Sequence, residues 1–265
     1  MYQRRATSGG GLGIRLIIGI IIAVISVVSY LGSQQYNEVV GENQHVSITP
    51  DQEIALGLQS APSMEQEFGG LLRDSRAQQT VDSVGDDIVH NSVASDTPWR
   101  FSFGVLQDPQ TVNAFALPGG PVYITDALFS RLETPDQLAG VLAHEITHVL
   151  ARHSAQQIAK SDLTNGLVGA VGVASGSADA TRTAAVIAQL VNMRYSREDE
   201  TQADTFGVCL MLQSGYDPNG MIDVMHILEE AGGSGGQPEF FSTHPNPENR
   251  IAAIQQAIAN ADQNC

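Results

Sequence analysis

The chain has 265 residues, of which 42% are hydrophobic, and a formal net charge of −16 at pH 7. This length suits one large domain or two small ones with a buried core. The charge is uneven, because the first 32 residues hold three arginines and no acid, whereas the remainder contains a single lysine, Lys160. A surface this acidic argues against nucleic acid or an anionic membrane surface as a partner.

The first predicted element is one N-terminal transmembrane helix. Residues 16–31 are almost entirely apolar, and Arg15 and the basic tail before it are expected to stay in the cytoplasm. The rest of the chain would then be extracytoplasmic, and periplasmic if the source is a Gram-negative bacterium. The alternative is a signal peptide cleaved at Val27-Val28-Ser29, but the run is longer than an ordinary signal core, which favours an uncleaved anchor.

Three regions are predicted on this basis: a basic tail and anchor at 1–33, a polar linker at 34–48 and one domain at 49–265. The domain opens with Thr49-Pro50-Asp51-Gln52, which combines a capping threonine, a proline at the first helical position and a glutamine placed for a capping box. A helix is expected from there to about residue 60. Apolar residues at helical spacing predict a second helix over roughly 70–95.

A short β-sheet is predicted next. Its three strands, separated by turns that contain proline, are 100–106, 112–117 and 121–125. The edge of such a sheet can pair with an extended peptide, and Asn113 and Ala114 are the candidate residues for that contact. A purely structural hairpin is the alternative that the sequence leaves open.

A buried helix follows the sheet. Thr134, Pro135 and Gln137 repeat the capping pattern seen at Thr49. The positions that keep most of the cylinder apolar are Leu138, Val141, Leu142, Ile146, Val149 and Leu150. The sequence therefore predicts that the polar residues within this helix are buried.

Those polar residues are His144, Glu145 and His148. Histidines four positions apart are separated by about 40° of rotation, so both rings project from one face and can bind one metal ion. Glu145 is close enough to reach a water on that metal without being a ligand. This HExxH arrangement is typical of zinc peptidases. The alternative, two core histidines and a stray glutamate, is disfavoured because a buried carboxylate beside two imidazoles is costly.

A catalytic zinc site needs a third protein ligand. His153 lies nine residues beyond His144 and would be on the opposite side of an unbroken helix, so it is not expected to join. Glu200 and Asp204 are four residues apart on a helix predicted from Ser196. One of these carboxylates can bind the metal while the other hydrogen-bonds a ligand histidine.

Other features of the C-terminal half leave alternatives open. Cys209 and Cys265, the only cysteines, could form a disulfide in an oxidising compartment, or remain two unreactive thiols. Residues 163–175 and 183–193 are apolar, but they are short for a membrane span and the glycines of 163–175 weaken a helix there. Both stretches could pack over the site or touch the membrane surface, and packing is the expected arrangement. The final helix is predicted to begin near residue 246.

Four ordered sequence blocks resemble the gluzincin family of zinc metallopeptidases, which includes HtpX, the CAAX prenyl endopeptidase, LoiP and BepA. The blocks are Asn113-Ala-Phe-Ala-Leu-Pro-Gly-Gly120 with Val122-Tyr-Ile-Thr125, His144-Glu-Ile-Thr-His148, Ser196-Arg197 with Glu200-Thr-Gln-Ala-Asp204, and Ser242-Thr-His-Pro245 with Glu248 and Arg250. The likeness covers about residues 53–250. It implies an α+β fold, a mostly helical zincin-type metallopeptidase domain with a small β-sheet.

The same resemblance implies the composition of the site. One Zn²⁺ per chain would be held by His144, His148 and Glu200, with Asp204 as the neighbouring support and Glu145 as the catalytic base. His244 would approach the metal, either to polarise the substrate carbonyl or as a ligand that plugs a resting site. The alternative is that His244 has no role at the metal and only precedes Pro245 at the start of a helix.

With one anchor and no appended repeat domain, the layout is closest to LoiP-like proteases. The expected function is a zinc-dependent endopeptidase that cleaves misfolded or damaged exported or membrane proteins. Its expected partners are these unfolded proteins and, through the N-terminal helix, a membrane. The alternative function is a chaperone-like binder of unfolded exported proteins with a mainly structural zinc.

Overall fold

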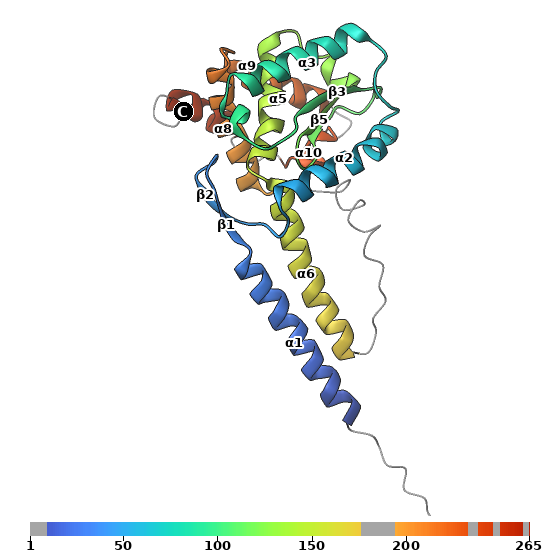
Figure 1. Cartoon of the computed structure of the whole chain (residues 1–265). Coiled ribbons are helices and arrows are strands. Elements are labelled where there is room, and N and C mark those ends of the chain that lie inside the picture. The colour runs from blue at the N-terminus through green and yellow to red at the C-terminus, as the bar shows by residue number, and fades with distance from the viewer. Residues whose placement is uncertain (1–9, 176–193, 233–237, 246–249, 262–264) are drawn as a thin grey trace, which may run out of the picture.

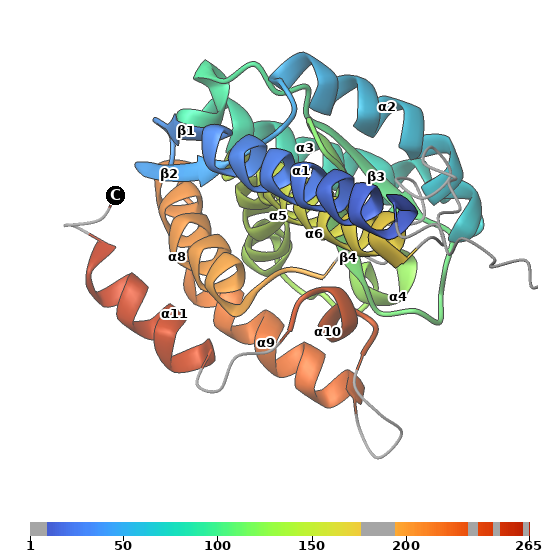
Figure 2. The ribbon, with the colours of Figure 1, turned by 90° about the horizontal axis from the view of Figure 1, so that it is seen from below.

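A computed structural model describes residues 10–175, 194–232, 238–245, 250–261 and 265. It shows a mostly helical domain from which two helices project side by side (Figures 1 and 2). They are α1 (Gly10–Gly32) and α6 (His153–Ser175). The stretch Leu12–Gly32 of α1 is long and apolar enough to cross a membrane, as predicted. Residues 163–175, which were expected to pack over the site, instead form the second half of α6 and pack against α1 outside the domain, and the stretch 183–193 lies outside the described residues.

Residues 34–48, predicted as a linker, instead contain an antiparallel hairpin of β1 (Gln34–Asn37) and β2 (Glu42–His45). Two side-chain amides of the hairpin bind the end of the helix that carries His144 and His148. Asn37 donates to the carbonyl oxygen of Leu150 and Gln44 to that of Ala151, each at 2.8 Å. The hairpin therefore connects α1 to the core of the domain.

Two helices and a 3₁₀ turn follow: α2 (Pro50–Glu67), α3 (Ser75–His90) and η1 (Val93–Asp96). The capping box predicted at Thr49 is complete, with Thr49 Oγ1 accepting from the backbone N–H of Gln52 and the Gln52 side chain accepting from that of Thr49. Helix α2 runs further than residue 60, and α3 begins later than residue 70 because Asp74 provides its N-cap.

The predicted strands form one sheet in the order β3-β5-β4, so β4 lies at an edge. Their bounds are Ser102–Leu106 (β3), Ala114–Ala116 (β4) and Pro121–Thr125 (β5), followed by the short α4 (Asp126–Phe129). Strand β5 pairs parallel with β3 and antiparallel with β4. The tight turn between β4 and β5 requires Gly119, whose φ is +77° and whose added Cβ would lie 2.4 Å from the Cα of Ile54 on α2.

Helix α5 (Pro135–Leu150) occupies the centre of the domain and is buried at every position from Gln137 to Leu150. It packs against α3, β4, α8 (Arg197–Gln213) and α9 (Asn219–Gly232) (Figure 1). Gly140 permits close contact with α9, because a Cβ there would lie 3.0 Å from the Cα of Met221. The capping box predicted at Thr134 is half formed: Thr134 Oγ1 accepts from the N–H of Gln137, but the Gln137 side chain accepts from the N–H of Glu133.

Helix α5 ends and α6 begins in a new direction at Arg152, whose backbone φ is +54°. Such a backbone costs a non-glycine residue about 1–3 kcal/mol, so other contacts must hold it. The buried guanidinium donates to Glu53 Oε1 at 2.7 Å and to the carbonyl oxygen of Ile48 at 2.8 Å. Burial raises the pKa of Glu53 to about 7, although Arg152 partly opposes the rise. These contacts turn the chain sharply, so α6 leaves in a new direction.

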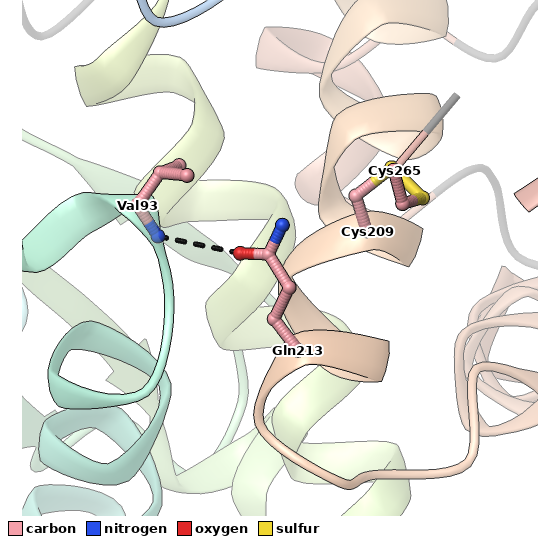
Figure 3. Close-up of a disulfide and its surroundings, with 4 residues drawn as sticks. All are labelled: Val93, Cys209, Gln213 and Cys265. Carbon is pink, nitrogen blue, oxygen red and sulfur yellow. Dashed lines mark hydrogen bonds between the residues drawn. A yellow bond between two sulfur atoms is a disulfide. The ribbon is translucent and has the colours of Figure 1, made fainter. Parts of the chain in front are cut away.

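The C-terminal part consists of α10 (Phe240–Thr243) and α11 (Arg250–Ala259). The predicted start of the last helix near residue 246 lies outside the described residues. Cys209 on α8 and Cys265 form a disulfide (Figure 3), which decides between the two alternatives that the sequence left open. The bond ties the end of the chain to a helix that packs directly on α5.

Reducing this disulfide is expected to lower the free energy of unfolding. The bridge closes a loop with a sequence separation of 56 residues, and constraining an unfolded loop of that length is worth about 4 kcal/mol. Urea unfolding followed by the fluorescence of Trp99, with and without dithiothreitol, measures the change. The Cys209→Ala/Cys265→Ala variant is the control and should not respond to the reductant. Equal urea midpoints for the oxidised and reduced protein would contradict the expectation.

Candidate metal centre

Four side chains from three separate segments bring one donor atom each to a common point. They are His144 and His148 on α5, Glu200 on α8 and His244, which directly follows α10. These donor atoms all lie within 4.8 Å of one another, and all four residues are buried. The set contains the three residues predicted to bind metal together with His244.

The separations of the donor atoms suit a small cation. His144 Nε2 lies 3.0 Å from His148 Nε2, 3.4 Å from His244 Nδ1 and 3.5 Å from Glu200 Oε2. His244 Nδ1 lies 3.1 Å from Glu200 Oε1. Tetrahedral zinc with ligand bonds of about 2.0–2.1 Å separates neighbouring ligands by roughly 3.3–3.4 Å. The residues therefore fit a zinc ion.

The protonation pattern of His144 leaves its Nε2 free for a metal. Its Nδ1 donates to Asp204 Oδ1 at 2.9 Å, and Arg250 donates to both oxygens of the same carboxylate at 2.7 and 2.8 Å. Burial alone would raise the pKa of Asp204, but the charge of Arg250 and the hydrogen bonds of His144 and Arg250 outweigh it and lower the pKa to about 2. Asp204 is thus an ionised acceptor that fixes the ring of His144.

A second chain of hydrogen bonds orients His148. Gln202 Oε1 accepts from His153 Nε2 at 2.9 Å, which leaves His153 Nδ1 to accept from His148 Nδ1 at 2.8 Å. The remaining nitrogen of His148, Nε2, then carries a lone pair. With these tautomers the Nε2 atoms of His144 and His148 present lone pairs to each other at 3.0 Å, an arrangement that is repulsive unless a metal ion or a proton lies between them.

The sequence reasoning on His153 rested on an unbroken helix, and that premise is wrong. The break at Arg152 brings the His153 ring against His148 instead of turning it to the opposite side. His153 does not belong to the group of four donors, but it contacts one of them. Its role beside His148 was missed because the sequence carries no clear signal for a left-handed residue at 152.

Glu200 is ionised in this environment. Burial would raise its pKa, but the neighbouring charges of His244, His144 and Arg250 lower it further than burial raises it. Arg250 Nη1 lies 3.3 Å from Glu200 Oε2. The sequence indicated Arg250 only as part of a motif. In the structure its guanidinium contacts both Glu200 and Asp204 on α8.

Glu145 is buried, with both carboxylate oxygens lacking a hydrogen-bond partner among the described residues. Its nearest charged neighbour is His244, whose Nε2 lies 3.5 Å from Glu145 Oε1. Burial raises the pKa of Glu145, and this effect exceeds the opposing influence of His244 and His144. A carboxyl group with a raised pKa and unused oxygens is equipped to accept a proton from a reacting water.

A cavity of about 150 Å³ opens beside His244. Its lining is Met64, Glu67, Phe68, Asn113, Phe115, Ala116, Leu117, Pro118, Ser154, Tyr195, Glu239, Thr243 and His244. Asn113 lies in this wall, and its Oδ1 is buried without a hydrogen-bond partner among the described residues. Ala114, the other predicted substrate contact, does not line the cavity, because its side chain packs into the core.

Tyr195 was not predicted from the sequence as a site residue. Its ring stacks on that of His148, with 4.0 Å between the ring centroids.

Comparison with known proteins identifies related peptidases. The model of peptidase family M48 matches residues 75–258. The chain is 32% identical to the "Mitochondrial metalloendopeptidase OMA1" of Schizosaccharomyces pombe, with 88% of the chain and 69% of that protein covered. It is 34% identical to the "Beta-barrel assembly-enhancing protease" of Escherichia coli, over 69% of the chain but only 39% of the relative. It is 33% identical to the OMA1 protein of Saccharomyces cerevisiae, over 67% of the chain and 52% of the relative.

Replacing His153 is expected to weaken zinc binding without removing a ligand. His153→Leu deprives His148 of the acceptor that fixes its tautomer, and losses of such supporting contacts typically cost 10–100-fold in metal affinity. His153→Gln keeps an acceptor oxygen and should lose less. Competition with a chromophoric chelator measures the affinity.

The control for this experiment is His226→Leu, because His226 is exposed. It should bind zinc like the unmodified chain. An affinity of folded His153→Leu within threefold of the unmodified chain would show that the hydrogen bond to His148 does not support the site.

Proposed function

The chain belongs to peptidase family M48, and from that premise we propose that it is a membrane-anchored, zinc-dependent endopeptidase. The observation that carries the proposal is the convergence of ring nitrogens of His144 and His148, 3.0 Å apart, with Glu200, whose pKa is lowered by its neighbours. The names of the relatives from S. pombe and E. coli, a metalloendopeptidase and a protease, support the same activity.

His144, His148 and Glu200 would hold the ion. A zinc ion held there would supply a lowered pKa for a bound water, toward about 7, and polarisation of the peptide carbonyl. Glu145 is placed to accept a proton from the attacking water and to donate it to the leaving amine. Asp204 and His153 hold the two imidazoles in position through their hydrogen bonds.

The edge of the sheet supports binding of an extended substrate. Asn113 and Leu117 hydrogen-bond β5 through Thr125 and Pro121, so the alternation of an antiparallel pair turns the backbone groups of Ala114 and Ala116 away from β5. Among the described residues no backbone hydrogen bond occupies these groups, and although Ala114 and Ala116 are buried, a peptide that reached this edge could pair with them as an added strand does. Ala114 would therefore contact substrate through its backbone.

The adjoining cavity favours apolar substrate side chains. Its wall includes Met64, Phe68, Phe115 and Leu117. Unfolded or damaged proteins expose apolar side chains that folded proteins bury. We therefore propose misfolded exported or membrane proteins as the substrate class, with the domain on the extracytoplasmic side of the membrane that α1 crosses.

His244 would close the site at rest. A catalytic zinc site keeps one position open, whereas a set of four protein ligands leaves none. The ring of His244 stacks on Phe240 at 4.4 Å and its Nδ1 lies among the other donors. Withdrawal of this one side chain would open the position that a substrate carbonyl or water needs.

A closed set of four ligands also suits the alternative function, a chaperone-like binder with structural zinc. Glu145 argues against it, because a structural site has no use for a buried carboxylate whose two oxygens both lack partners.

Glu145→Gln should retain one zinc per chain and lose proteolysis. The amide fills the same space but cannot accept the proton, and loss of a general base typically costs 10²–10⁴-fold in rate. Casein cleavage by the purified full chain, with metal content measured on the same sample, tests this. Cleavage at close to the unmodified rate would refute the assignment.

Glu200→Ala should lose the metal. Glu200 is the one anionic member of the set, so its removal leaves only the imidazoles of His144, His148 and His244 and takes away the charge attraction for the cation. Metal analysis after dialysis gives the zinc content per chain, and the exposed Glu198→Ala on the same helix is the matched control. Full zinc retention by Glu200→Ala would remove Glu200 from the ligand set.

His244→Ala should retain zinc and cleave peptides faster than the unmodified chain, because it opens the fourth position. Initial rates on a fluorogenic peptide, with Thr243→Ala as the neighbouring control, measure the effect. A fall in rate with zinc retained would instead show that His244 assists the reaction directly.

A further inference from the structure

The second half of α6, Leu163–Ser175, contains no charged residue and runs antiparallel to α1 outside the domain (Figures 1 and 2). Helix α6 starts at the metal centre, because its first residue is His153, and then extends away from the domain. Neither the metal ligands nor the substrate cavity uses this second half. Its surroundings therefore require a separate explanation.

The two helices meet along a stripe of small residues. The less exposed residues of α1 are Gly19, Ile22, Ala23, Ser26 and Tyr30, and those of α6 are Leu163, Gly166, Ala170, Val173 and Ala174. A Cβ added to Gly19 would lie 2.8 Å from the carbonyl oxygen of Ala170, and one added to Gly166 would lie 2.1 Å from Ser26 Oγ. Close approach of backbones through small residues is characteristic of helix pairs in membranes.

The outward side of α6 is apolar and exposed, like that of α1. Leu167, Val168 and Val171 are 38%, 65% and 69% exposed, and on α1 Ile20 and Val28 are each 62% exposed. Exposed apolar side chains therefore occur along both helices of the pair. A surface of this kind in water would be a strong site for association or aggregation.

Both helices change from apolar to polar at the same level. Helix α1 ends at Gly32, where the polar hairpin begins, and the Tyr30 ring stacks on His45 of that hairpin. On α6 the last charged residue before the apolar half is Asp162, whose Oδ2 accepts a hydrogen bond from Ser47 at 3.3 Å. Ser47 lies two residues beyond β2, so the two polar boundaries are physically connected.

We propose that Leu163–Ser175 is embedded in the same lipid bilayer as α1, with acyl chains covering Leu167, Val168 and Val171. The proposal rests on the membrane anchor described above. Thirteen helical residues extend about 20 Å, so the segment enters from the side of the domain and passes through most of a hydrocarbon core of about 30 Å.

This placement also sets the height of the active site. The ten residues from His153 to Asp162 extend about 15 Å along the helix, so the metal centre lies within about that distance of the bilayer. An extended chain covers 15 Å in about five residues. The site would therefore reach segments of membrane proteins that lie directly outside the bilayer.

Site-directed fluorescence in vesicles tests the proposal. Val168→Cys and Val171→Cys are introduced separately into the full chain and labelled with an environment-sensitive probe without reductant, so that the Cys209–Cys265 disulfide stays closed. The proteins are reconstituted into phosphatidylcholine vesicles that carry nitroxide-labelled acyl chains. Val28→Cys on α1 reports the anchor, and Lys160→Cys, exposed on α6 above the boundary, reports the aqueous side.

Probes at positions 168, 171 and 28 should be quenched by the lipid nitroxides, whereas the probe at 160 should be quenched only by an aqueous quencher. Quenching at 28 with aqueous exposure at both 168 and 171 would overturn the proposal for α6 and leave the anchor intact. Aqueous exposure at 28 as well would show that the anchor itself is wrong. Zinc content of each labelled variant confirms that the domain is folded.

Discussion

The structure depends on the Nε2 atoms of His144 and His148, which lie 3.0 Å apart on one buried helix. Each nitrogen presents a lone pair to the other. Each ring is committed to this orientation, since its other nitrogen donates to Asp204 or to His153. Without a positive charge between them the two nitrogens repel each other in a region of low dielectric. Helix α5, the carboxylate of Asp204 and the contact of His153 with His148 are therefore arranged around a cation.

The N-terminal part of the domain stabilises this centre from a distance. Glu53 on α2 and the carbonyl oxygen of Ile48 hold the guanidinium of Arg152, which allows the left-handed backbone between α5 and α6. That turn in the chain brings His153 against His148. Loss of the contacts of Arg152 would therefore disturb His148, a candidate metal ligand, through His153. It would also change the direction in which α6 leaves the domain.

Regular periodicity made much of the molecule predictable. The spacing of His144 and His148, and that of Glu200 and Asp204, follows from the helical repeat, and the structure brings three of these four side chains together with His244. The three strands and the complete capping box at Thr49 also follow from local sequence. These features depend on residues close in the chain, where the backbone geometry is known in advance.

The remainder depends on contacts that local sequence does not report. Residues 34–45 lack the alternation of apolar residues that marks a strand, and they pair because Asn37 and Gln44 find carbonyl groups at the end of α5. The break at Arg152 is possible only because Glu53, 99 residues earlier, is buried beside it. The glycines of 163–175, which weaken an isolated helix, allow α6 to approach α1 closely.

Electrostatics links the base to the metal. The neighbouring histidines and Arg250 lower the pKa of Glu200, and Arg250 lowers that of Asp204, so both carboxylates stay ionised beside Glu145. Burial favours the protonated form of Glu145 in the protein alone. A divalent cation among the neighbouring side chains would favour the ionised form. Metal binding would thus favour the carboxylate form of Glu145 that catalysis requires.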